Sequence, residues 1–493
     1  LVAVAAPDRA QPAQAAARGG AATPVQASAG GLAGFAADLR EAFAGDLAEL
    51  RAPTIYRIDA RLDEPARSLF VRQEVRYVHR GARALGDLYF RLLPNQRGQG
   101  GSLTVEAVTV PDRRLGWALA LDGTALRVEL EPPLLPGEAL TLALTYRVVV
   151  PESNPVGFGI FSYDNGVFTL GHFYAWIPVH DEAGWHLSLP TDLGDPTFTE
   201  AALYEVTLTV PAGLRVAGTG RLVEARPNPD GTVTTRHVAG PVRDLNLVAG
   251  RGLKSVQRDV NGIRVASYYV EDHDQEALTV LGYAVDALRV FERRFGPYPY
   301  RELDVVEAPV RAVGMEYPGL VLMGSQVYRP PVGAYQWPLE FTVVHEVAHQ
   351  WWYGLVGSDQ QGEPWLDEAL ASYAPILYYQ EVYGPERARA ELEAALGAPY
   401  DAVVALGLDG PVRQPVAAFT RESYFGVVYA RGGLFVDALR HEVGDTVFDR
   451  IMQSYLREFR YRNAHSDDFL RIAEREAGRS LAALYSHWGL VGP

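Results

Sequence analysis

The feature that most constrains the fold is a change of hydrophobic period near residue 254. Before it, short runs such as SLFVRQEVRYVH and LTLALTYRVVV alternate apolar and polar residues, with turn residues between the runs. A period of two is typical of half-buried strands, so residues 54–254 are expected to form a β-sandwich or a large curved saddle-like sheet. After it, segments such as EALTVLGYAVDALRVFERRFG have a helical period. We therefore predict an α+β protein with a β-rich domain over residues 54–254 and a mainly helical domain over residues 255–493.

The first 53 residues resemble neither domain. Residues 1–31 are mostly Ala, Gly, Pro and Gln. Such a segment buries too little apolar surface to offset its ordering entropy, so we expect a flexible leader. Within it, Ala3-Val4-Ala5 resembles the small-residue end of a signal peptide, which favours an exported protein (periplasmic, cell-envelope or secreted) over a cytoplasmic one. Residues 32–53 carry an apolar residue every three or four positions and are predicted to form one amphipathic helix that ends at Pro53.

Composition excludes several classes of function. The net charge of −15 and the pI of about 5.3 argue against a partner such as nucleic acid that is bound through its phosphates. The absence of cysteine rules out thiolate metal ligands and a cysteine nucleophile. The chain also lacks an apolar run of the roughly 18 to 20 residues that a transmembrane helix needs. Nothing in the composition indicates an oligomeric state.

The segment VVHEVAHQWWYG, residues 343–354, has the spacing of a metal site. It follows Pro338 and is expected to be helical, so His345 and His349 would project from one face and could bind one zinc ion. Glu346 would lie about 100° around the helix, where it can reach a water molecule rather than the ion. The alternative is a buried helix in which both histidines serve only packing.

A catalytic zinc site needs a third protein ligand and one open position. Eighteen residues separate His349 from Glu368, which lies in a second expected helix, PWLDEALASYAPILYYQEVYG at 364–384. The loop between the two helices is long enough to reverse the chain, so Glu368 is the favoured third ligand. By spacing alone the alternatives are Glu363, Asp367 and Glu381, and Asp367 could instead orient a ligand. Pro375 inside the second helix predicts a kink or a break.

These motifs resemble those of the gluzincin zinc aminopeptidases of the aminopeptidase N family. That family has H-E-x-x-H, then eighteen residues, then Glu in a W-L-N-E-G-F-A-S-Y-like run, and this chain has HEVAH and WLDEALASY. Asp367 stands where the family has Asn. The resemblance covers residues 54–488 and implies an N-terminal β-sandwich or saddle domain, a thermolysin-like catalytic domain, and one Zn²⁺ per chain with Glu368 as third ligand. It is a resemblance to a short form without the family's C-terminal helical domain.

A second stretch resembles the strand of this family that binds the substrate. The family has Gly-Ala-Met-Glu-Asn, whose glutamate holds the free α-amine, and the matching stretch here is VGMEYPG at 313–319. Met315 and Glu316 match, whereas Gly314 and Tyr317 replace the family's Ala and Asn. The resemblance implies a substrate-binding role for these four residues.

A third stretch, VYARGGLFVDAL, resembles the family's tyrosine followed by x-Lys-Gly, with Arg431 in place of lysine. It implies that Tyr429 stabilises the transition state, and Tyr424 is the nearest rival by position. Tyr174 and Trp176 could join Met315 in shaping an apolar pocket, although ordinary packing explains such residues equally well.

Together the motifs predict a zinc-dependent aminopeptidase that removes N-terminal residues from peptides. In it, Glu346 acts as general base, Tyr429 stabilises the developing oxyanion, and Glu316 binds the free N-terminus of the peptide. One alternative is a thermolysin-like zinc endopeptidase with the same ligands. A less favoured alternative is a non-catalytic protein that only binds peptides.

Overall fold

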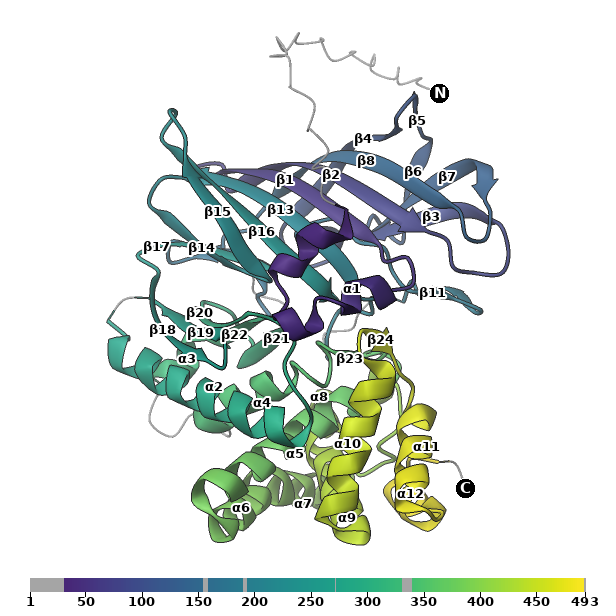
Figure 1. Ribbon diagram of the computed structural model, residues 1–493, viewed down its shortest axis with the longest axis vertical. Helices are drawn as coiled ribbons and strands as arrows, with labels where there is room; N and C mark the ends of the chain where they lie inside the picture. The colour runs from purple at the N-terminus through teal and green to yellow at the C-terminus, as the bar shows by residue number, and fades with distance from the viewer. Residues whose placement is uncertain (1–30, 154–157, 189–192, 271, 330–338, 492–493) are drawn as a thin grey trace, which may run out of the picture.

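The computed structural model describes residues 31–153, 158–188, 193–270, 272–329 and 339–491. Nearly all of the predicted leader falls outside these residues, as does Pro338. A β-rich region occupies one end of the molecule and a mainly helical region the other (Figure 1). Among the described residues, no helix combines the length and the apolar character that crossing a bilayer requires.

The β-rich region is built around one eight-stranded sheet. Its inward side chains alternate with exposed ones, as in β1, where every second residue from Ile58 to Leu62 is buried. This alternation is the pattern that predicted strands here, and the prediction is confirmed. In spatial order the strands are β15 (Arg221–Pro227), β16 (Thr232–Val242), β13 (Ala202–Pro211), β1 (Ile55–Asp63), β2 (Ser68–Val78), β8 (Ala139–Val149), β4 (Ser102–Val110) and β5 (Arg113–Arg114).

Smaller sheets complete this region. The pairing is antiparallel throughout the eight-stranded sheet except between β1 and β13, where Ile58 lies opposite Val206 in a parallel register. A three-stranded sheet contains β3 (Leu85–Arg91), β7 (Ala125–Leu134) and β6 (Trp117–Ala120), a four-stranded sheet contains β14 (Leu214–Gly218), β17 (Leu247–Arg251), β10 (Val167–Leu170) and β9 (Phe161–Asp164), and a short hairpin contains β11 (His180–Asp181) and β12 (Gly184–Trp185).

The second region begins with a sheet before it becomes helical. Its five strands are, in spatial order, β18 (Lys254–Val260), β19 (Ile263–Tyr269), β20 (Glu302–Ala308), β22 (Leu320–Gly324) and β21 (Gly314–Tyr317). β21 is the edge strand and pairs antiparallel with β22. The predicted boundary after residue 254 falls on the first residue of β18, and the division into domains stays a prediction.

The helices lie on and beyond this sheet (Figure 1). α2 buries one apolar stripe, which explains why its period was readable in the sequence. The helices are α2 (Asp274–Arg294), α3 (Ser325–Tyr328), α4 (Leu339–Ala348), α5 (Trp365–Tyr383), α6 (Pro385–Leu392), α7 (Ala398–Ala405), α8 (Arg421–Tyr424), α9 (Gly432–Val443), α10 (Asp445–Phe459), α11 (Ser466–Ala477) and α12 (Ala482–Trp488). A two-residue ladder joins β23 (Val356–Gly357) to β24 (Arg462–Asn463).

One prediction of local structure is wrong, and a second is settled in part. Residues 32–53 do not form one helix but two 3₁₀ turns, Leu32–Ala37 and Glu41–Phe43, and a four-residue helix α1, Asp46–Glu49. The apolar stripe is buried as predicted, but the backbone between the turns bonds elsewhere: the Arg40 N–H donates to the Pro299 carbonyl at 2.8 Å. Pro375 predicted a kink or a break; α5 continues through it, so the break does not occur and the kink stays a prediction.

Candidate active site

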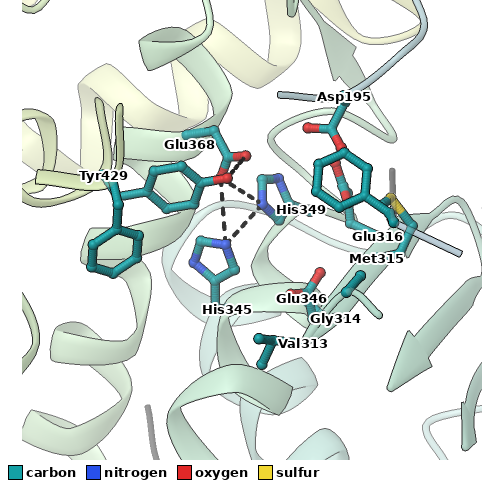
Figure 2. A pocket seen from close by; sticks show the side chains of 13 residues that line it. Asp195, Val313, Gly314, Met315, Glu316, His345, Glu346, His349, Glu368 and Tyr429 are labelled. Atoms are coloured by element: carbon teal, nitrogen blue, oxygen red, sulfur yellow. Dashed lines mark hydrogen bonds and ion pairs between the residues drawn. The ribbon is translucent and has the colours of Figure 1, made fainter. Parts of the chain in front are cut away.

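A cavity of about 460 Å³ opens where β21, α4 and α5 meet. Its volume falls in the range of sites that take a small ligand. Eight of the nine residues that the sequence singled out as metal-binding, catalytic or substrate-binding lie in its wall with others from distant segments (Figure 2). The wall consists of Phe158, Asp195, Ala312, Val313, Gly314, Met315, Glu316, His345, Glu346, His349, Glu368, Phe425 and Tyr429.

His345, His349 and Glu368 form the metal end of this cavity. The Nε2 atoms of the two histidines are 3.1 Å apart, and Glu368 Oε2 lies 3.5 Å from one and 3.4 Å from the other. A tetrahedral zinc ion with ligands at about 2.0–2.1 Å would hold them about 3.3 Å apart, so this triangle has the size of one face of such a site. Two imidazoles and one carboxylate also form a donor set that suits zinc. The predicted triad therefore fits the ion in geometry and in chemistry.

Backbone carbonyls orient both imidazoles. His349 Nδ1 lies 2.9 Å from the Trp352 carbonyl oxygen, and the Ala371 carbonyl interacts with His345. The Ala371 carbonyl is available because Pro375, four residues later, has no N–H to donate to it. The Trp352 carbonyl can hold the Nδ1 proton of His349 and leaves its Nε2 facing the metal end, which is how ligand tautomers are commonly fixed.

Burial and mutual charge set the protonation of the triad. Burial acts to raise the pKa of Glu368, but hydrogen bonds with both histidines outweigh it and lower that pKa to about 2. Burial acts to lower the pKa of His349, yet the charges of Glu316 and Glu368 raise it well above its ordinary value. The metal-free site therefore holds a proton among these groups, and a cation would take the place of that proton.

Glu346 projects into the cavity beside this triad, from α4 (Figure 2). Burial raises its pKa well above the ordinary value, and the nearby charge of Glu316 raises it further. Gly314 is the residue that makes room for it, because a Cβ on Gly314 would lie 2.1 Å from Glu346 Oε1. The missing side chain of Gly314 therefore leaves the space that the Glu346 carboxylate occupies.

Glu316 and Asp195 form the other end of the cavity, which we call the amine end, across from Tyr429 (Figure 2). Glu316 lies on the edge strand β21, and Gln360 Nε2 donates to its Oε1 at 3.3 Å. Burial raises the pKa of Glu316, whereas the charge of His349 lowers it. Asp195 was missed by sequence reasoning because it carries no motif and comes from the β-rich region, some 120 residues before Glu316. Burial raises its pKa, and Glu316 raises it further.

Tyr429 stands over the metal end on a π-helical segment, Phe425–Arg431. Its hydroxyl donates a short hydrogen bond to Glu368 Oε1. Burial and the Glu368 charge raise its pKa well above 10, so the phenol keeps its proton and remains a donor. The rival Tyr424 does not line the cavity, and its ring packs against Tyr429 at 5.7 Å.

The other candidates for third ligand are occupied elsewhere. Glu363 accepts a hydrogen bond from Arg413 at 3.1 Å. Glu381 lies near the far end of α5 and forms ion pairs with Arg293 and Arg294 of α2. Asp367 is buried next to the site, and its Oδ1 accepts the backbone N–H of Glu368 at 2.8 Å. The three-ligand cluster found among the described residues is His345, His349 and Glu368.

Tyr317 is a predicted substrate residue that the structure does not bring into the cavity wall. Its side chain is buried in the protein, where its ring packs on His172 at 5.5 Å. Met315 does line the cavity. Tyr174 and Trp176 do not: both are buried in the hydrophobic core.

A family comparison bears on this site. Residues 280–488 match the model of the peptidase family M1 domain. The matched span contains the triad, Glu346, Glu316 and Tyr429. Over these residues the chain is similar to peptidase family M1.

Relatives of the M1 domain are long proteins. The chain is 25% identical to Aminopeptidase M1-B of Oryza sativa subsp. japonica over 79% of its own length, and it covers 47% of that protein. It is 30% identical to Aminopeptidase B of Homo sapiens over 38% of its length, covering 30% of that protein. The chain thus spans less than half the length of these relatives.

Solved structures share the whole fold. The crystal structure of an M1 zinc metallopeptidase from Deinococcus radiodurans superposes with a TM-score of 0.67, covering 90% of this chain and 96% of that one at 23% identity. A mutant bound to a Tyr-Ser-Ala substrate gives the same TM-score and identity. The arrangement of β-rich and helical domains is therefore that of the two-domain M1 metallopeptidases.

Proposed function

We propose that this protein is a zinc-dependent aminopeptidase that removes single residues from the free N-terminus of peptides. The observation that supports this most is the pair of buried carboxylates, Glu316 and Asp195, at one end of a cavity whose other end is the metal triad. A cavity of about 460 Å³ closed by negative charge suits one N-terminal residue with its ammonium group.

The residues of the metal end would bind the ion and transfer the proton of the attacking water. Zinc bound by His345, His349 and Glu368 would supply a Lewis acid that activates water and polarises the scissile carbonyl. The raised pKa of Glu346 lets its carboxylate accept the proton of the attacking water, keep it, and pass it to the leaving amine.

Tyr429 would stabilise the oxyanion that develops on the substrate carbonyl. Its hydroxyl already points into the metal end, where it donates to Glu368. A buried phenol whose pKa is raised stays protonated, so it can turn its donor to the new negative charge.

Substrate register would be set by the amine end. Glu316 would bind the α-ammonium by a charge-assisted hydrogen bond, and the edge strand β21 would pair with the peptide backbone by strand addition. A peptide extended beyond this point would bring neutral backbone against two buried carboxylates, which disfavours an endopeptidase.

The test is hydrolysis of an aminoacyl-fluorophore by the zinc-loaded chain. We expect turnover that a chelator abolishes, zinc restores, and Glu346→Gln removes. Turnover that persists in Glu346→Gln would refute the proposed base, and turnover unaffected by the chelator would refute the metal.

Export is a separate proposal that depends on the sequence of Ala3-Val4-Ala5 and the segment after it. These residues lie outside the part of the chain that the structure describes. Cell fractionation of the native protein would test it, and activity confined to the cytoplasm would contradict it.

A further inference from the structure

The turn that follows α4, residues 349–356, contains a residue in an unusual backbone conformation. Tyr353 has a φ of 137°, whereas the other described non-glycine residues with positive φ lie between 44° and 64°. A bulky side chain at such a φ is strained, and the conformation persists only where the surroundings fix it. Tyr353 lies four residues after the proposed metal ligand His349, so the contacts that fix it can bear on the metal site.

Two residues from the end of β16 hold Tyr353 at opposite ends. Arg243 Nε donates to the Tyr353 carbonyl at 2.6 Å, and the Tyr353 hydroxyl donates a short hydrogen bond to Asp244. Arg243 is 1% exposed and Asp244 is fully buried. The backbone and the phenol of Tyr353 are thus both anchored to the β-rich region.

Arg243 is itself fixed by three other groups. Its guanidinium donates to the Thr199 carbonyl at 3.1 Å and makes short hydrogen bonds to the Arg462 carbonyl and to the Asn463 side chain. Gly357 leaves the space it needs, because a Cβ there would lie 2.0 Å from the guanidinium carbon. A buried arginine that bonds several carbonyls has little freedom to move.

Asp244 is fixed as firmly. Its Oδ1 accepts from Asn246 Nδ2 at 3.0 Å, and its Oδ2 lies 3.4 Å from His172 Nε2. His172 is in turn held by a hydrogen bond from its backbone N–H to Asn246 Oδ1 at 2.9 Å. The anchor for the Tyr353 hydroxyl is therefore a buried polar network rather than a mobile side chain.

This arrangement determines where the Trp352 carbonyl points. The φ of Tyr353 is the rotation between the peptide plane that carries the Trp352 carbonyl and the rest of Tyr353. With the Tyr353 carbonyl and side chain both anchored, that rotation is set, and so is the Trp352 carbonyl. That carbonyl lies 2.9 Å from His349 Nδ1.

We propose that Arg243, Asp244 and Tyr353 form a clamp by which the β-rich region positions the metal ligand His349. The clamp residues are positioning residues that act through the Trp352 carbonyl. They fix the imidazole with Nε2 towards His345 and Glu368, which prepares the site for the ion. This inference rests on the metal site of the proposed function, but not on the identity of the substrate.

The test is metal affinity of metal-free protein, measured by titrating Zn²⁺ against a chromophoric chelator, together with the absorption spectrum of bound Co²⁺. The main variant is Tyr353→Phe, which removes one hydroxyl and keeps the ring. We expect zinc binding to weaken about 10- to 100-fold, as for other residues that orient metal ligands, and the Co²⁺ spectrum to change. Arg243→Met should weaken zinc binding at least as much.

Matched controls separate positioning from general loss of stability. Tyr146→Phe removes another buried tyrosine hydrogen bond, from Tyr146 to Gln73 Oε1 at 2.5 Å. Arg91→Met removes another buried arginine that donates to carbonyls, that of Leu187 at 2.9 Å among them. Both controls should lower the melting temperature of the metal-free protein without altering zinc affinity.

Two results would overturn the clamp, and a third would refute the proposed function instead. Zinc affinity within twofold of wild type in Tyr353→Phe, with an unchanged Co²⁺ spectrum, would overturn the clamp even if Arg243→Met fails to fold. Equal weakening in the Tyr146→Phe control would also overturn it, since loss of stability would then explain the effect. A wild-type protein that binds no zinc would instead refute the proposed function on which the clamp depends.

Discussion

The two ends of the cavity are assembled in different ways. The metal end comes from α4, the residue directly after it and α5, which are close in sequence. His345, His349 and Glu368 meet there because of helical spacing and one chain reversal. The amine end joins Glu316 on an edge strand to Asp195 from the β-rich region and Gln360 from a loop. The comparison teaches that the metal ligands come from one short stretch of the chain, whereas the carboxylates of the amine end come together only when the two regions dock. Breaking each end should therefore give a different kind of defect.

The largest effect is expected from removing a ligand at the metal end. His345→Ala leaves two ligands, and we expect loss of zinc by elemental analysis and loss of turnover to background. Metal content equal to wild type in this variant would contradict the triad. The matched change at the amine end, Glu316→Gln, should retain zinc fully.

The next effect separates metal binding from proton transfer. Glu346→Gln should keep one zinc per chain yet lower kcat by about 10²- to 10⁴-fold, because the amide cannot accept the water proton. Steady-state kinetics on zinc-loaded protein measures it. A variant that loses zinc along with activity would mean that Glu346 is needed for zinc binding rather than for proton transfer.

A smaller defect is expected at the amine end. Glu316→Gln removes one charge-assisted hydrogen bond, which corresponds to a loss of about 1.5–3 kcal/mol, or roughly 10- to 150-fold in kcat/KM for free-amine substrates. Burial raises the pKa of both carboxyl groups; the charge of Glu368 then raises the pKa of Glu316, and the charge of Glu316 raises that of Asp195. A bound ammonium group is therefore expected to favour their charged forms. An unchanged kcat/KM would remove Glu316 from substrate binding.

The smallest effect concerns Asp367, the neighbour that spacing alone could not separate from Glu368. Burial and then the Glu368 charge raise its pKa to about 8, from 3.8. The folded protein thus binds a proton that the unfolded chain releases above about pH 4, so this group costs stability as pH rises from about 4 to 8. Asp367→Asn should retain zinc, and its unfolding free energy in metal-free protein should improve relative to wild type by at least about 1 kcal/mol over that range. Denaturant titrations at pH 5 and pH 8 measure it, and a relative loss with rising pH would contradict the assignment.

The sequence predicted what depends on short-range geometry. The i, i+4 histidines, the spacing to Glu368 and the alternating strands are all readable because helix and strand periods are fixed. The same reasoning failed for residues 32–53, where an apolar stripe is buried by short turns whose backbone bonds to the second region. It also failed to separate Tyr317 from its neighbours on β21, because facing depends on how the strand sits on its sheet.

The contacts between the two regions could not be predicted from the sequence either. Asp195 and Arg243 belong to the β-rich region and carry no motif, yet one lines the cavity and the other anchors the turn after α4. The stretch QWWYG, which has no evident chemistry in the sequence, contains the carbonyl and the strained tyrosine through which that anchor acts. Their roles depend on burial and contact, which periodicity does not reveal.

The most direct test of the account compares one aminoacyl-fluorophore with its N-acetylated form on zinc-loaded wild-type protein. Acetylation removes the positive charge for which the amine end is built and changes nothing at the metal end. The account predicts rapid, chelator-sensitive cleavage of the free amine and loss of at least about 100-fold in kcat/KM for the acetylated form. Equal cleavage of both substrates would contradict the aminopeptidase and point to an endopeptidase with the same metal site.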